Sequence, residues 1–114
     1  MKEFIFLFRS EKNATENLNP GEMQEYMEKW RIWLNKFAEA GKYEDGDRLD
    51  ISKAKTIRGI EKVVTDGPYI ESKEVIGGYV RVKAENMEEA VEMAKGCPVL
   101  SFNGSVEIRT GYDV

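Results

Sequence analysis

The chain has 114 residues and a net charge of −4, from 21 acidic and 17 basic residues. Its length suits one domain, expected over residues 1–114, and an apolar content of 41% indicates a folded rather than a disordered chain. Acidic and basic residues alternate without a dense basic patch, which argues against nucleic acid and anionic membranes as partners.

The chain has no histidine and a single cysteine, Cys97. The usual general base, the commonest metal ligand and the Ser-His or Cys-His nucleophiles are therefore absent, so we expect no metal site and no cofactor. Cys97 follows the end of the second predicted helix, where the helix dipole disfavours a thiolate nucleophile. Without a disulfide, a signal peptide or a membrane span, the sequence favours a cytoplasmic protein.

The first predicted elements are a strand and a long helix. Residues 1–9 alternate as a strand, and both of its faces are apolar, so both should be covered. The helix begins at Asn19, which can cap it, and ends near Gly41. Its apolar stripe consists of Met23, Tyr26, Met27, Trp30, Leu34, Phe37 and Ala38. Trp33 is expected on the flank of this stripe, and Ile32 lies on the opposite face without a core partner.

The middle of the chain predicts a hairpin followed by a strand. Residues 49–57 look extended but irregular, residues 63–65 form a clearer strand, and Gly59 between them indicates a hairpin. A turn at residues 66–68 stops the second strand, and residues 69–76 form a charged connection. The next predicted strand is residues 79–83. Its alternation places Val80 and Val82 toward the core, and Tyr79, Arg81 and Lys83 on the other side.

The last predicted elements are a second helix and a closing strand. Asn86 caps the helix, and Gly96 and Pro98 mark its end. Its inner face is expected to carry Met87, Ala90, Val91 and Ala94. In the closing strand, residues 106–109, Val106 and Ile108 point inward while Glu107 and Arg109 point away.

This order of elements predicts an α+β fold of the ferredoxin-like βαββαβ type with an inserted β-hairpin. Two helices would lie on one face of an antiparallel sheet. The other face mixes polar and apolar side chains and lacks a cover within the chain. A symmetric second copy is the simplest cover, so we expect a homodimer in which two sheets form an α/β barrel around a partly wet cavity.

The most unusual stretch is residues 63–79, VVTDGPYIESKEVIGGY. It resembles the DGPF-motif branch of the YCII-related family, in which a strand ends in Thr-Asp-Gly-Pro-Phe. In that branch a Glu, a Lys-Glu pair and a strand-opening Gly-Gly follow. The matching residues are Asp66, Gly67, Pro68, Glu71, Lys73, Glu74, Gly77 and Gly78, and Tyr69 stands where the family has Phe. Weaker matches extend to the opening strand, the helix start at residues 19–22, residues 56–58 and residues 104–109.

The resemblance implies a dimeric α/β barrel with a pocket near the Asp-Gly-Pro turn. Some relatives look like lactone-processing or isomerising enzymes of small molecules, and others accompany or are fused to sigma factors. One branch has a histidine–aspartate pair proposed as catalytic. Because this chain has no histidine, only the position of Asp66 carries over.

Asp66 and Tyr79 are the predicted catalytic residues. A carboxylate at a strand end beside glycine is open to a ligand, and desolvation in a dimer cavity would raise its pKa toward that of a useful base. The alternative is that Asp66 only caps the turn. Tyr79 could donate a hydrogen bond or a proton, and Arg81 could bind a carboxylate, with Arg58 and Arg109 as weaker candidates. The alternative for all four is packing across the dimer.

The remaining candidates form a predicted substrate-binding set around the turn. With the three arginines, this set comprises Gly67, Pro68, Tyr69, Glu71, Lys73, Glu74, Gly77 and Gly78. The charged members could instead be a solvated cluster, worth only about 0–1 kcal/mol per exposed pair. The two glycines could allow close approach of a ligand or another chain, or could mark a bulge or strand entry.

Three functions remain open from the sequence. The first is a cofactor-free small-molecule enzyme of the isomerase, lyase or lactone hydrolase type, with its pocket at the dimer interface near Asp66. The second is a non-catalytic ligand-binding or regulatory module, linked to transcription through protein contacts as the resemblance to sigma-factor-associated relatives implies. The third is a structural dimer whose cavity is a filled interface. The sequence names neither a substrate nor a reaction.

Overall fold

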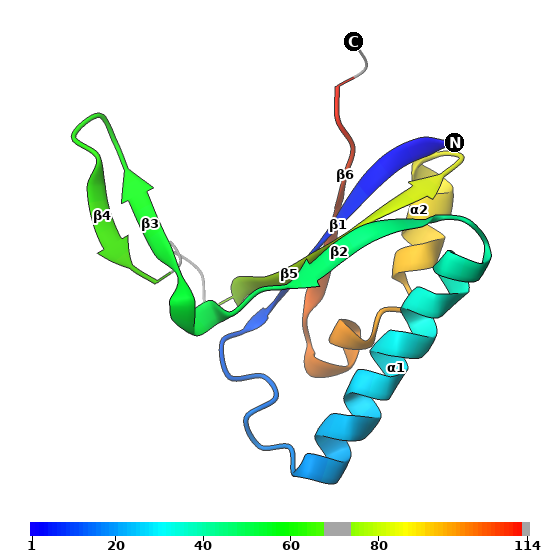
Figure 1. Cartoon of the computed structure of the whole chain (residues 1–114), viewed down its shortest axis with the longest axis horizontal. Coiled ribbons are helices and arrows are strands. Elements are labelled where there is room, and N and C mark those ends of the chain that lie inside the picture. Colours follow the sequence, from blue (N-terminus) through cyan, green and yellow to red (C-terminus); the bar gives the residue numbers. More distant parts are fainter. Residues whose placement is uncertain (68–73, 113–114) are drawn as a thin grey trace.

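The computed structural model describes residues 1–67 and 74–112, in which both helices lie on one face of a four-stranded antiparallel sheet (Figure 1). The sheet has the order β2-β5-β1-β6, with β1 at Lys2–Glu11, β2 at Tyr43–Arg48, β5 at Glu74–Ala84 and β6 at Ser105–Arg109. The helices are α1, Pro20–Glu39, and α2, Met87–Ala94. Short 3-10 turns lie at Ile51–Lys53 (η1) and Pro98–Phe102 (η2). The predicted ferredoxin-like arrangement is confirmed.

Strand β1 occupies the centre of the sheet because its apolar alternation suits burial. Phe4, Phe6 and Phe8 share one face of the strand and are buried in the core beneath the helices. Phe4 lies opposite Val82 and Phe6 opposite Val80 in the antiparallel register with β5. These cross-strand pairs form the floor of the core, and β6 flanks β1 on its other side.

Helix α1 begins at the predicted cap, but one of the residues that it buries in the core is not among those predicted. The Asn19 side chain accepts a hydrogen bond from the Glu22 backbone N–H at 2.8 Å, and Glu22 Oε1 accepts from the Asn19 N–H at 3.1 Å. The prediction that Trp33 lies on the flank is wrong, because Trp33 is buried and stacks against Phe6. Its indole N–H donates to the Met93 carbonyl at 3.0 Å, so it also ties α1 to α2.

The predicted position of the second strand of the sheet is wrong. This strand lies at β2, before the irregular stretch at residues 49–57, which instead contains η1 and most of β3. The sequence of β2, Tyr-Glu-Asp-Gly-Asp-Arg, has no apolar alternation because β2 is an edge strand with a largely solvated surface. Strand β5 also begins earlier than predicted, at Glu74, so residues 74–76 are strand rather than connection.

Helix α2 packs through small residues. Ala90 and Ala94 are buried, as predicted, whereas Met87 is 40% exposed and does not line the core. The reason is its place at the first helical residue, beyond the end of the packed face. Val106 and Ile108 of β6 pack against the same core from the other side.

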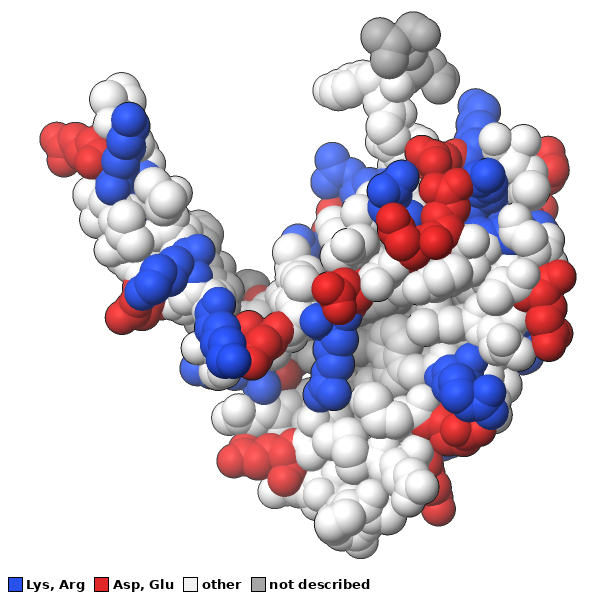
Figure 2. All heavy atoms as spheres, in the orientation of Figure 1, with Lys and Arg blue, Asp and Glu red and all other residues white. Residues whose placement is uncertain are grey.

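The predicted hairpin forms a separate two-stranded sheet from β3, Lys55–Arg58, and β4, Val63–Asp66. Figures 1 and 2 show this hairpin as an arm that stands off the body, with an open notch between the two. We call residues 55–66 the hairpin arm. The arm rises on the side of the sheet that the helices leave uncovered (Figure 1).

Candidate functional site

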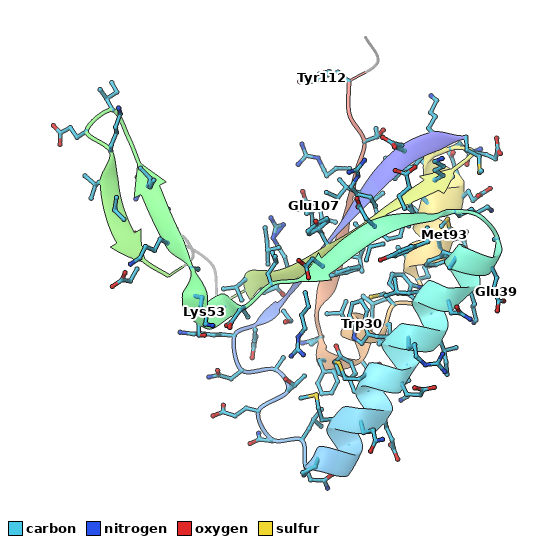
Figure 3. The ribbon with its side chains drawn as sticks, viewed as in Figure 1. Trp30, Glu39, Lys53, Met93, Glu107 and Tyr112 are labelled. Atoms are coloured by element: carbon cyan, nitrogen blue, oxygen red, sulfur yellow. The ribbon has the colours of Figure 1, made fainter. Side chains whose placement is uncertain are left out.

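The sheet face that points away from the helices, here called the open face, carries three of the predicted site residues. Tyr79 lies opposite Leu7 of β1 and Asp47 of β2, and it is half-buried. Arg81 and Arg109 both lie opposite Ile5. Figure 3 shows Glu107 on this side of the sheet and Trp30 on the helix side. Tyr79 therefore has an apolar neighbour on one side and a carboxylate on the other.

Arg81 lies among three carboxylates on this face. Its guanidinium is 3.6 Å from Glu3, 3.5 Å from Glu44 and 3.4 Å from Asp45. A hydrogen bond between the Glu3 and Glu44 carboxyls raises the pKa of Glu3 and lowers the pKa of Glu44. Arg81 is thus balanced by its own chain, which weakens its predicted role as the anchor of a substrate carboxylate.

A second charge cluster lies at the β1–β6 side of the open face. Glu107 accepts hydrogen bonds from Arg9 and, at 3.0 Å, from Arg109. The Arg9 bond, followed by the Arg109 bond, lowers the pKa of Glu107. Because the Arg109 side chain is 66% exposed, it retains donors that face solvent.

Asp66 lies on the hairpin arm and not on the open face. Its side chain is 90% exposed and forms an ion pair with Lys55 on the opposite strand. The following Gly67 takes a positive φ of 88°, and its N–H donates to the Ala54 carbonyl at 2.7 Å. The Gly67 carbonyl accepts from the Thr56 hydroxyl at 2.9 Å. Within one copy, Asp66 is a solvated carboxylate beside an ammonium group.

The two predicted glycines serve the backbone of the sheet. Gly77 is the extra residue where the β1–β5 register shifts, since Phe8 faces Gly78 and Arg9 faces Ile76. A Cβ at Gly78 would lie 2.9 Å from the Asp47 carbonyl oxygen, so the absence of a side chain at Gly78 allows β2 to lie close to β5. This favours the bulge and strand interpretation over close approach of a ligand.

The remaining predicted residues divide between the arm, β5 and the part of the chain outside the described residues. Arg58 lines a shallow hollow of about 440 Å³ on the arm, together with Ile60 and Val63. Glu74 begins β5 opposite Glu11. The residues that lie outside the described ranges are Pro68, Tyr69, Glu71 and Lys73.

The structure therefore separates the two predicted catalytic residues. Tyr79, Arg81 and Arg109 come together on the open face, whereas Asp66 and Arg58 lie on the hairpin arm and Gly67 follows its last residue. Sequence reasoning missed the carboxylates that surround Arg81, although outward-pointing charges beside apolar alternation were a usable signal in β1. The signal was absent for β2, whose strand was not recognised.

Other features bear on the chemistry available to the chain. Cys97 is buried, and burial raises the pKa of its thiol to about 12, which leaves it a poor nucleophile. Within residues 1–67 and 74–112, no three acidic or cysteine side chains are grouped so that they could hold a metal ion. In the same ranges, no helix is both long and apolar enough to cross a bilayer.

Comparison with known proteins gives one family match. The model of the YCII-related domain matches residues 4–111 of the chain. None of the curated proteins matches the sequence. One solved structure that resembles the chain is 5-chloro-2-hydroxyhydroquinone dehydrochlorinase (TftG) from Burkholderia phenoliruptrix AC1100, in complex with 2,5-dihydroxybenzoquinone. The similarity has a TM-score of 0.49 and 13% sequence identity, and covers 96% of this chain and 93% of that chain.

Proposed function

Because the chain belongs to the YCII-related domain family, we propose that it is a small-molecule enzyme whose site lies between two copies of the chain. The observation that supports this proposal is the open face. Tyr79 is half-buried near the middle of a sheet face that the helices leave uncovered, with Leu7 beside it. A second copy facing this surface would enclose a cavity with both apolar and polar walls.

The proposed chemistry is proton transfer at a carbon next to a carbonyl group. The Asp66 carboxylate takes the proton and becomes a carboxylic acid, while the electron pair of the C–H bond moves onto the carbonyl oxygen. The Tyr79 hydroxyl donates a hydrogen bond to the oxyanion that forms. Return of the proton to another carbon gives an isomer, and expulsion of a leaving group from the neighbouring carbon gives the product of a lyase.

Exchange of carbon-bound protons in D2O tests this function without knowledge of the substrate. Proton NMR would follow loss of the signal next to the carbonyl in a panel of small keto acids and lactones. We expect Tyr79→Phe and Asp66→Asn to slow the exchange of an active compound by roughly 10²–10⁴-fold. Tyr112→Phe, at a 99% exposed tyrosine near the C-terminal end, is the matched control.

The outcome that contradicts the proposal is equally direct. If proton exchange is as fast in both variants as in the wild-type chain, Asp66 and Tyr79 do not have the assigned roles. A chain that binds a compound but accelerates exchange of none would instead be a ligand-binding or regulatory module. Light scattering tests the premise of a dimer, which predicts twice the chain mass of 13.1 kDa.

A further inference from the structure

The hairpin arm exposes an unusual amount of apolar surface for its size. Ile57 is 67% exposed, Ile60 99%, Val63 53% and Val64 57%. An isolated two-stranded hairpin is at best marginally stable in water, and it needs a third strand or a packed layer for support. The arm therefore requires a cover that its own chain does not supply in the described residues.

One face of the arm combines an apolar patch with the predicted base. In the register of the hairpin, Ile57 lies opposite Val64 and Lys55 opposite Asp66. Residues opposite one another in an antiparallel pair share a face, and alternate pairs do so as well. The Ile57–Val64 pair and the Asp66 carboxylate thus point to the same side of the arm. Whatever covers the apolar pair also comes close to Asp66.

Two observations favour a second copy of this chain as the cover. A segment whose folding depends on its cover needs a partner that is present whenever the chain is, and another copy meets that need. The charges are also complementary. The arm has three basic and two acidic residues, a net charge of +1, and since the whole chain carries −4, the remaining residues carry −5. On the open face itself, the three carboxylates of Glu3, Glu44 and Asp45 surround the two cations Arg81 and Lys83, so this cluster also carries an excess of negative charge that favours the basic arm of another copy.

The direction of the arm selects the surface on which it docks. The arm and the open face lie on the same side of the sheet, and an open notch separates them (Figures 1 and 2). A two-fold axis that brings two open faces together therefore brings each arm onto the other copy. Tyr79 on the open face and Asp66 on the arm, which belong to different sheets in one chain, can meet across this interface.

We propose that the hairpin arm packs on the open face of a second copy, so that Asp66 of one copy completes the site that contains Tyr79 of the other. This inference rests on the proposed function for the role of the site. The arrangement explains why the arm is apolar, why it stands apart from its own body, and why Asp66 is solvated within a single copy.

Sedimentation of charged variants tests the docking. Ile57→Asp is expected to weaken the dimer at least about tenfold, because a charge would be buried in the contact. Ile32→Asp is the matched control, since Ile32 is 47% exposed and lies on α1, outside both the hairpin arm and the open face. The near-ultraviolet circular dichroism of Trp30 and Trp33 would show whether the body stays folded. An unchanged dimer in Ile57→Asp overturns the inference.

Leu7→Asp separates failure of this inference from failure of the proposed function. If Leu7→Asp breaks the dimer and Ile57→Asp does not, the open faces meet without the arm, and only the inference falls. If the wild-type chain is a monomer, both fall. If Ile57→Asp breaks the dimer but no compound undergoes proton exchange, the docking stands and the proposed chemistry is wrong.

Mixing two inactive variants tests whether the site is shared. In a mixed dimer of Asp66→Asn and Tyr79→Phe, a site built from two copies is intact once, whereas a site built from one copy is always defective. Random mixing makes half of the dimers mixed, with one of two sites restored, so we expect about a quarter of the wild-type exchange rate. Failure of the mixture to exceed the separate variants, with mixed dimers confirmed by native mass spectrometry, shows that Asp66 of one copy and Tyr79 of the other do not form one site.

Discussion

The carboxylate of Glu107 lies between two guanidinium groups, and this position makes the stability of the fold depend on pH. Hydrogen bonds from Arg9 and Arg109 hold its pKa below the ordinary value of 4.5. The folded chain therefore binds this proton more weakly than the unfolded chain does. The resulting stabilisation is fully present above pH 4.5 and is lost as the pH falls through the lowered pKa of the folded state.

We predict that Glu107→Gln flattens the acid limb of the stability curve. Urea midpoints measured between pH 7 and pH 3 should fall less steeply in the variant than in the wild-type chain, because one carboxylate with a lowered pKa is gone. Glu16→Gln, in the exposed loop between β1 and α1, serves as the control. Identical slopes for Glu107→Gln and the wild type would show that this cluster does not couple to folding.

Among the elements, β2 depends on glycine for its contact with β5. A Cβ at Gly46 would lie 2.7 Å from the Tyr79 carbonyl oxygen and 3.0 Å from Cγ2 of Val80. Both neighbouring atoms belong to β5, one of the two inner strands, and one of them is a backbone atom that cannot rotate away. The close approach of β2 and β5 thus sets the position of Tyr79 on β5 as well as that of the edge strand β2.

Gly46→Ala is expected to destabilise the chain by about 1–3 kcal/mol, as overpacking does elsewhere. Gly77→Ala is the matched variant in β5, since nothing lies within 4 Å of its added Cβ and its φ is not positive. That change should stay within about 0.5 kcal/mol of the wild type. Chemical denaturation measures both free energies of unfolding, and equal values would contradict the crowding at Gly46.

The strength of local patterns explains which elements the sequence predicts. Strand β1 and the second half of β5 alternate cleanly, and the Asn19 cap has a near-complete local signature. Strand β2 has no such pattern, because an edge strand is selected for solubility rather than burial. Trp33 was misplaced because the stripe on α1 is wide, and only the packing angle decides which residues reach the sheet.

The candidate site is less predictable than the fold, for a geometric reason. Alternation placed Tyr79, Arg81 and Arg109 on one face, because the strand period alone determines it. The turn at Asp66 was also recognised, but its position relative to Tyr79 depends on how far the hairpin leaves the sheet. The carboxylates that β2 contributes around Arg81 could not be assigned, since β2 was not recognised as a strand and reaches β5 through long-range pairing.

At the scale of the whole molecule, Cys97 reports on the integrity of the core. It is buried beside Val99, and burial raises the pKa of its thiol to about 12. We predict that a disulfide reagent at pH 8 labels the native chain at least about 100-fold more slowly than the chain in urea, because the reactive thiolate forms only on opening. Rapid labelling of the native chain would mean that this end of the core is open to solvent.

The positions of the two tryptophans determine which part of the unfolding reaction their fluorescence reports. Both tryptophans belong to the helix side, where Trp33 donates to Met93 and Trp30 contacts Phe8 edge to face. Tryptophan fluorescence will therefore follow unfolding of the helix layer and will not change while the hairpin arm frays or detaches. Amide exchange at Ile57 and Val64 would register that earlier event, so the two signals together divide one melting curve into its two physical parts.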